Sequence, residues 1–236
     1  DSTANTVWLN KPFADETPRI KTDLLVEVQT GMGMRTRVGY RSLIGIEFGE
    51  ENSQQERRYE GRYTRSPSYP IIDPPLPGYV VTRVESEGRG VSLRRSYYRY
   101  GQYRVNTLTG KSLGFGFQEI EDVERKRVSR IRFLQDDGLV GSVASTTILQ
   151  GSRPQPISFS KSHYSVSSRL GISPVNDFKP VILRPQIKET STESRGLDGL
   201  VLSSQSDTFE YDDYGNPKLI RTVFGDGSGS ETGNHY

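Results

Sequence analysis

Polar and apolar residues alternate along most of this chain, and a period of two residues predicts β-strands. Between residues 23 and 40 the alternation is interrupted once, at Thr30-Gly31-Met32-Gly33. Val26 and Val28 share one face before that turn, and Val38 continues the period after it. The segment is therefore predicted to form a β-hairpin.

A second hairpin is predicted between Tyr97 and Phe117, where aromatic residues recur at every second or third position. Alternation places Tyr98 and Tyr100 on one face of its first strand and Arg99 on the other. Gly110 supplies the positive φ that a short turn needs. An aromatic face of this kind requires a larger sheet around it. The residues expected to build this hairpin are Tyr98, Tyr100, Leu113, Gly114 and Phe115.

The rest of the chain continues the pattern, and it predicts roughly a dozen strands with no convincing helix. The charged run 120–133 is predicted as a strand because Ile131 and Phe133 then share a face opposite Arg130 and Arg132. The prolines between residues 67 and 77 predict a loop. Further strands or strand fragments are expected at 79–84, 140–149, 157–159, 162–168, 181–184 and on both sides of the turn within 209–220. The fold class is therefore all-β, built from long antiparallel β-hairpins.

Composition narrows the possible functions. The 31 basic residues nearly balance the 29 acidic ones, which gives a net charge of +2 and no strong preference for an acidic or basic partner. The chain has no cysteine, which excludes disulfides and thiol chemistry. No apolar run reaches the roughly 20 residues of a membrane span. The chain opens with Asp1, which predicts that it is a piece of a longer polypeptide.

Candidate catalytic groups are few, and each has a simpler structural explanation. His163 and His235 lie far apart in polar surroundings, and no nucleophile elbow accompanies them. The carboxylate pair Glu119 and Glu121 lies among arginines, and the pair Asp212 and Asp213 lies in a turn sequence. Interleaved acidic residues disfavour nucleic acid as a partner for the basic, aromatic run near Arg99. No cofactor, metal or catalytic residue is expected.

Several motifs resemble a known family. Tyr211-Asp212-Asp213-Tyr214-Gly215-Asn216-Pro217 resembles the YD repeat of Rhs proteins. The stretches 23–40 and 97–115 resemble the start of the shell in the B component of Tc insecticidal toxins and related virulence proteins. Val7-Trp8-Leu9-Asn10 is similar to the closing strand of the β-propeller that precedes that shell. The residues that match the YD unit are Tyr211, Asp212, Tyr214, Gly215 and Asn216.

The resemblance implies a structural function. In that family long β-hairpins wind into a curved β-shell that encloses a toxic C-terminal polypeptide until delivery. The implied partners are the remaining shell of the same toxin and its enclosed polypeptide, with a toxin translocation component as a further candidate. The implied location is that of a secreted bacterial toxin, with assembly in the cytoplasm left open. Self-cleavage does not carry over, because Gly196-Leu197-Asp198-Gly199-Leu200 is only a superficial match.

Three regions are expected along the chain. Residues 1–20 form a terminal strand and linker, either a tail strand or the end of a preceding propeller. Residues 21–149 form shell-like hairpins, and residues 150–236 form further hairpins with one YD unit. The alternative function is a carbohydrate- or protein-binding β-sandwich or propeller domain, in which exposed tyrosines and Trp8 would stack on a ligand.

Overall fold

A computed structural model describes residues 6–9, 24–42, 59–60, 67–74, 78–151, 155–170 and 181–234. These residues form β-strands and their connections, with no helix among them, which confirms the predicted all-β fold class. Several predicted features lie outside the described residues. They are the linker expected after Asn10, the prolines Pro75 and Pro77, and His235. The strands are β1 (Thr6–Leu9), β2 (Leu25–Gln29), β3 (Arg35–Ser42), β4 (Tyr59–Glu60), β5 (Ile71–Ile72), β6 (Tyr79–Gly88), β7 (Val91–Gly101), β8 (Arg104–Asn106), β9 (Lys111–Gly114), β10 (Phe117–Asp122), β11 (Arg127–Phe133), β12 (Val143–Gln150), β13 (Ser158–Leu170), β14 (Val181–Arg195), β15 (Val201–Tyr211), β16 (Pro217–Phe224) and β17 (Gly229–Gly233).

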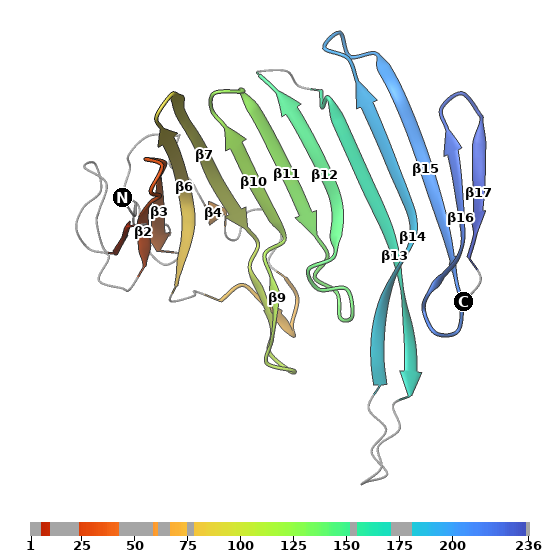
Figure 1. Cartoon of the computed structure of the whole chain (residues 1–236). Helices are drawn as coiled ribbons and strands as arrows, with labels where there is room; N and C mark the ends of the chain where they lie inside the picture. Colours follow the sequence, from red (N-terminus) through yellow and green to blue (C-terminus); the bar gives the residue numbers. More distant parts are fainter. Residues whose placement is uncertain are drawn as a thin grey trace.

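Fourteen of the described strands form one sheet; thirteen follow the order β1-β2-β3-β6-β7-β10-β11-β12-β13-β14-β15-β16-β17, and β4 lies off this path (Figure 1). Neighbours along this path pair antiparallel, and β4 joins β7 through a short parallel pairing. Strands β5, β8 and β9 form a separate three-stranded sheet at one end of β7 and β10. Because most strands pair with their sequence neighbours, consecutive hairpins extend the sheet in one direction.

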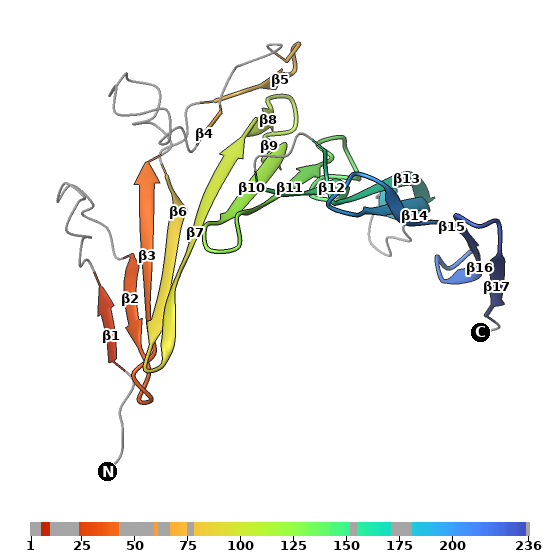
Figure 2. The ribbon, with the colours of Figure 1, turned by 90° about the horizontal axis from the view of Figure 1, so that it is seen from above.

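The large sheet is curved. Seen from above, its strands follow an arc, with β1, β2, β3, β6 and β7 visible along their length and β13 and β14 strongly foreshortened (Figure 2). The strand direction therefore rotates across the sheet, as the twist between neighbouring strands accumulates. The sheet continues without interruption past residue 150, because β12 pairs with β11 on one side and β13 on the other.

The sheet is a single layer with little apolar core. Among the described residues, the buried hydrophobic side chains are Val26 and Leu113, with 6% and 3% of their surface exposed. Glu27 and Glu119 are as inaccessible, at 3% and 8% exposed, although both are charged. Contacts between neighbouring strands thus take over the role that packing between layers has in a sandwich.

The predicted hairpin at residues 30–33 is confirmed. Strands β2 and β3 pair from Glu27 opposite Arg37 to Gln29 opposite Arg35. The N–H of Gly33 donates to the carbonyl oxygen of Thr30 at 2.9 Å and closes the turn. Gly33 has a φ of 79°, which glycine adopts without steric cost.

The predicted hairpin between Tyr97 and Phe117 has a different pairing. Strand β7 pairs with β10, so that Tyr98 faces Ile120 and Arg99 faces Glu119. The turn at Gly110 instead joins β8 to β9, which leave the large sheet for the small one. The observed register brings an arginine and a glutamate together, which the expected pairing of Tyr98 and Tyr100 with the 113–117 segment did not offer.

The prediction of one strand over residues 120–133 was also wrong, because the chain reverses within it. Strand β10 ends at Asp122 and β11 begins at Arg127, and the two strands pair with each other. The Asp122 carboxylate accepts a hydrogen bond from the N–H of Arg125 at 3.0 Å, and Lys126 has a φ of 51°. A short side chain that bonds to the backbone two or three residues later favours such a turn.

Strands β13 and β14 form the longest hairpin of the described chain, and its outer part extends beyond the sheet (Figure 1). Strand β12 pairs only with Ser158–Lys161 of β13, and β15 pairs only with Glu189–Arg195 of β14. Residues 162–170 and 181–188, called the ribbon below, therefore pair mainly with each other.

Candidate functional site

One face of the sheet carries rows of opposite charges on neighbouring strands. Residues directly opposite each other in a sheet point to the same face, so the register identifies these rows. The first row crosses β2, β3, β6 and β7 and consists of Glu27, Arg37, Glu85 and Arg95. The second row crosses β7, β10 and β11 and consists of Arg99, Glu119 and Arg130. These seven residues are called the charged face.

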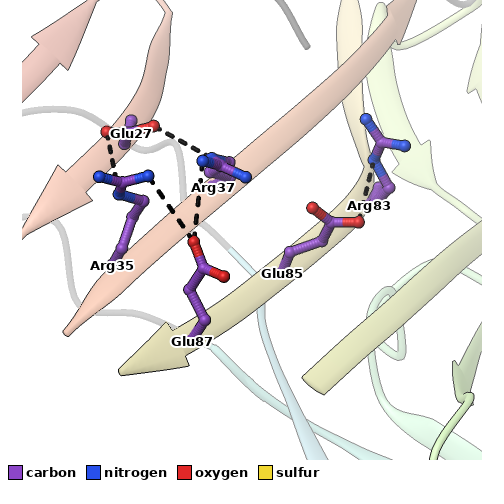
Figure 3. Close-up of polar contacts among 6 residues, drawn as sticks. All are labelled: Glu27, Arg35, Arg37, Arg83, Glu85 and Glu87. Atoms are coloured by element: carbon purple, nitrogen blue, oxygen red, sulfur yellow. Dashed lines mark hydrogen bonds and ion pairs between the residues drawn. The ribbon is translucent and has the colours of Figure 1, made fainter. Parts of the chain in front are cut away.

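Glu27 anchors the first row (Figure 3). Its two carboxylate oxygens lie 3.1 Å from Arg37 Nε and 3.6 Å from Arg35 Nε. Both arginines also approach Glu87 on β6, whose Oε1 lies 3.7 Å from Arg35 Nη1 and from Arg37 Nη2. Two arginines of β3 thus bridge carboxylates on the strands to either side, so the ion pairs hold three strands together.

Glu119 anchors the second row. Its Oε1 accepts a hydrogen bond from Arg99 Nη1 at 3.0 Å, and its Oε2 accepts one from Arg130 Nε at 2.8 Å. The carboxylate therefore has an arginine on each neighbouring strand, which compensates for its burial. Glu121, two residues along β10, shares this face but is exposed.

A third carboxylate closes the β10–β11 turn onto β7. Glu124 accepts hydrogen bonds from the main-chain N–H of Arg95 at 2.7 Å and from Arg95 Nε at 3.1 Å. The hydrogen bond from this main-chain N–H lowers the pKa of the Glu124 carboxyl below its usual value, and the arginine side chain adds to the effect. The charged form is thus the one that the fold stabilises.

These groups stabilise the pairing between neighbouring strands. Each buried carboxylate of the charged face, Glu27 and Glu119, is bonded to arginines of neighbouring strands. No cluster of His, Asp and Glu in the described part of the chain could hold a metal ion. His163 lies exposed on β13. Among the same residues, no helix is long and apolar enough to cross a membrane.

The predicted aromatic residues meet, although not as one hairpin. The ring centroids of Tyr100 and Phe115 lie 5.1 Å apart, and those of Tyr103 and Phe115 lie 5.4 Å apart. Leu113 is buried, and Gly114 ends β9 with a φ of 70°. Tyr98, by contrast, lies opposite Ile120 within the large sheet. Ring pairs at this spacing attract each other. The aromatic residues therefore join the small sheet to the end of β7.

The predicted YD residues form the turn between β15 and β16. Asp212 Oδ1 accepts hydrogen bonds from the N–H of Tyr214 at 2.9 Å and of Asn216 at 2.8 Å, and Oδ2 accepts one from Asn216 Nδ2 at 3.0 Å. The N–H of Asn216 is the largest cause that lowers the pKa of Asp212 below its usual value. Gly215 has a φ of 89°, so the turn requires the glycine that the motif provides.

The register of β7 does not favour the alternative of a carbohydrate- or protein-binding domain in which exposed tyrosines stack on a ligand. Tyr97 faces Glu121 and Tyr98 faces Ile120, so these two neighbours point to opposite faces of β7. Fourteen of the described strands also lie in one curved sheet, and they form neither a sandwich nor a propeller.

The ion-paired residues Glu27, Arg37 and Arg130 were not singled out from the sequence. The alternation in the sequence does indicate one charged face, because charged residues such as Arg35 and Arg37 lie two positions apart and therefore point to the same side of a strand. The partner of each charge depends on the register between strands, which alternation alone does not fix.

The fold has counterparts among solved structures. A single-layered, curved sheet of consecutive antiparallel hairpins matches the β-shell fold of Tc toxins, and the resemblance seen in the sequence motifs is supported by solved structures.

Two comparisons carry this likeness. The chain superposes on the Photorhabdus luminescens Tc holotoxin pore with a TM-score of 0.65 and 13% identity, over 86% of this chain and 12% of that one. It superposes on TcdB2-TccC3 without its hypervariable C-terminal region with a TM-score of 0.61 and 13% identity, over 85% of this chain and 12% of the other. At this identity the likeness shows the fold alone, and the chain spans about an eighth of the structures it matches. No family model matches the chain, and no curated protein matches it in sequence.

Proposed function

We propose that this chain forms part of the wall of a hollow β-shell that encloses a toxic C-terminal polypeptide until it is delivered. The observation that carries the proposal is the single-layered curved sheet, which buries almost no apolar core yet continues through fourteen described strands. A compact binding domain would stack two layers on each other, whereas a wall needs one layer with curvature.

The charged face supports the same function. A wall has no second layer to stabilise it, so its strands must be held within the plane of the sheet. Glu27 and Glu119, each bonded to arginines of neighbouring strands, provide such in-plane contacts.

A part of such a wall would have a structural role. The chain acts without catalysis, and its partners are the rest of the same shell and the enclosed polypeptide, with a translocation component as a further partner. The complete protein is a secreted bacterial toxin, and the YD residues Tyr211 to Asn216 form one repeat unit of its shell. The region 1–20, the region 21–149 and the region 150–236 remain the proposed divisions.

Electron cryo-microscopy of the complete native polypeptide tests the proposal. We expect a hollow particle with this chain in its wall and unassigned density inside. Limited proteolysis of the same particle should leave a C-terminal segment intact, and mild unfolding of the wall should make that segment cleavable. A solid particle, or a particle with this chain outside the wall, contradicts the proposed function.

A further inference from the structure

A groove of about 450 Å³ lies where the ribbon leaves the sheet, beside the turn that joins β15 to β16. One wall belongs to the ribbon and the other to the turn, so two segments far apart in sequence form it. The ribbon contributes Ser167, Arg184, Gln186 and Lys188, and the turn contributes Tyr211, Asp212, Asp213, Tyr214 and Gly215.

Contacts across the groove fix its shape. Arg184 Nη1 donates a hydrogen bond to the carbonyl oxygen of Tyr214 at 2.7 Å. The Tyr211 hydroxyl donates to the carbonyl oxygen of Ile187 at 2.8 Å. A Cβ added to Gly215 would lie 3.6 Å from Arg184 Nη1 and 3.7 Å from Gln186 Nε2, so both side chains end against the turn. The groove is therefore built from both sides and does not depend on an induced rearrangement.

The groove is lined by two cations, Arg184 and Lys188, and by two carboxylates, Asp212 and Asp213. Arg184 contacts a neutral carbonyl group, and Lys188 Nζ lies 5.8 Å from the centroid of the Tyr211 ring. Neither cation forms an ion pair with a carboxylate of the described residues, in contrast to the arginines bonded to Glu27 and Glu119. The Asp212 carboxylate is occupied by the N–H groups of its own turn. Both cations are thus left without a carboxylate partner among the described residues, and Asp213 is the one lining carboxylate that makes none of these turn bonds.

The shape of the site favours a chain-like ligand. Arg184, Gln186 and Lys188 follow one another along β14, a distance of about 13 Å in an extended strand. Strand addition is disfavoured, because Pro185 has no N–H and the carbonyl oxygen of Ile187 already accepts a hydrogen bond. Recognition there depends on side chains.

We propose that this groove binds an extended peptide segment through its Asp or Glu side chains, which pair with Arg184 and Lys188. Each carboxylate would gain a charge-assisted hydrogen bond, and the exposed ring of Tyr214 would border the segment. The proposal concerns the described surface itself and does not rest on the shell function.

Fluorescence anisotropy with the full 236-residue chain tests the proposal. The probes are a labelled peptide of alternating glutamate and serine and a peptide of equal length with lysine in place of glutamate, both at low ionic strength. The glutamate peptide should bind at least about tenfold tighter than the lysine peptide. The double variant Arg184→Gln with Lys188→Gln should weaken its binding about tenfold.

The matched control is Arg132→Gln with Lys161→Gln, two exposed cations on β11 and β13 whose loss changes the net charge equally. This control should leave the affinity unchanged, and Asp213→Asn, which removes a repulsive charge without disturbing the turn bonds, should increase it. An equal loss of affinity in both double variants would mean that net charge alone attracts the peptide. Peptide binding at the groove would then be refuted. Displacement of the peptide by inorganic phosphate, but not by chloride at equal ionic strength, would identify a small-anion site and overturn the peptide ligand.

Discussion

The hydroxyl group of Tyr211 donates a hydrogen bond to the main-chain oxygen of Ile187 at 2.8 Å. Strand β15 pairs with β14 only as far as Thr208 opposite Glu189, so this contact lies just beyond the end of the ladder. The tyrosine side chain thus satisfies a carbonyl group that the neighbouring strand no longer reaches.

Two other tyrosines make the same contact. The Tyr40 hydroxyl donates to the carbonyl oxygen of Leu25 at 2.9 Å, and the Tyr164 hydroxyl donates to that of Val143 at 3.0 Å. Leu25 begins β2 and Val143 begins β12, so both acceptors lie at the ends of strands. Tyrosines therefore join neighbouring strands where the main-chain ladder ends, a role that hydroxyl groups perform and phenylalanine would not.

Tyr211→Phe should lower the free energy of unfolding by about 0.5–1.5 kcal/mol, because the Ile187 oxygen loses its donor while the ring remains. Urea unfolding followed by circular dichroism measures the change. The control is Tyr69→Phe, whose ring is 75% exposed and which should change stability by less than about 0.5 kcal/mol. Equal effects at both positions would show that the Tyr211 hydroxyl bond is not stabilising.

Gly215→Ala should destabilise the β15–β16 turn by about 1–2 kcal/mol, since a φ of 89° is unfavourable for residues with a Cβ. The cost is in the backbone, because the added Cβ would meet no atom closer than 3.6 Å. Gly78→Ala is the matched control, because Gly78 has open space around it and no positive φ is recorded for it. Hydrogen exchange of the Asn216 amide should accelerate in Gly215→Ala alone. An unchanged hydrogen-exchange rate of the Asn216 amide would contradict the expected backbone strain at residue 215.

Asp212 should make the free energy of unfolding decrease as the pH falls. Its pKa in the folded state is lowered, chiefly by the N–H of Asn216, so its contribution is complete above the unfolded value of about 3.9. That contribution is lost as the pH falls through the folded value. Asp212→Asn keeps the size of the side chain and removes the charge. We therefore expect a smaller drop of its urea midpoint between pH 5 and pH 2 than in the unaltered chain.

Asp213→Asn is the control for this pH dependence, since it removes a neighbouring charge that makes none of the turn bonds to Tyr214 and Asn216. Its urea midpoint should fall with acid as steeply as that of the unaltered chain. Parallel curves for all three proteins would contradict the assignment to Asp212.

Local signals in the sequence predicted the turns better than they predicted which strands pair with each other. The turn at Gly33 and the turn at Gly215 are encoded within a few residues, and both were predicted. The partner of β7 was not, because β10 follows it only after β8 and β9 have formed a hairpin of their own. Pairing at a distance depends on which register satisfies Arg99 and Glu119, and no local pattern contains that information.

The longest hairpin was predicted only in fragments for a different reason. Strands β13 and β14 carry serine and threonine on both faces, as Thr192 opposite Ser160 on one face and Ser191 opposite Lys161 on the other illustrate. Apolar alternation is therefore weak, although β-branched threonine suits a strand. Their strand structure comes from pairing along the full length, which composition alone does not reveal.

Glu119 offers the sharpest test of how the sheet is held together. Glu119→Gln should lower the free energy of unfolding by about 1–2 kcal/mol, since Arg99 and Arg130 would lose their shared charge partner while solvent screens part of the effect. Urea unfolding measures this change, and Glu121→Gln is the matched control, because that exposed residue lies on the same face of the same strand. If Arg130→Gln is added, the second loss should be smaller than in the unaltered chain, because the ion pair is already broken. Additive losses would mean that Glu119 and Arg130 do not stabilise the sheet together, and this ion pair would then have no part in holding β10 and β11 together.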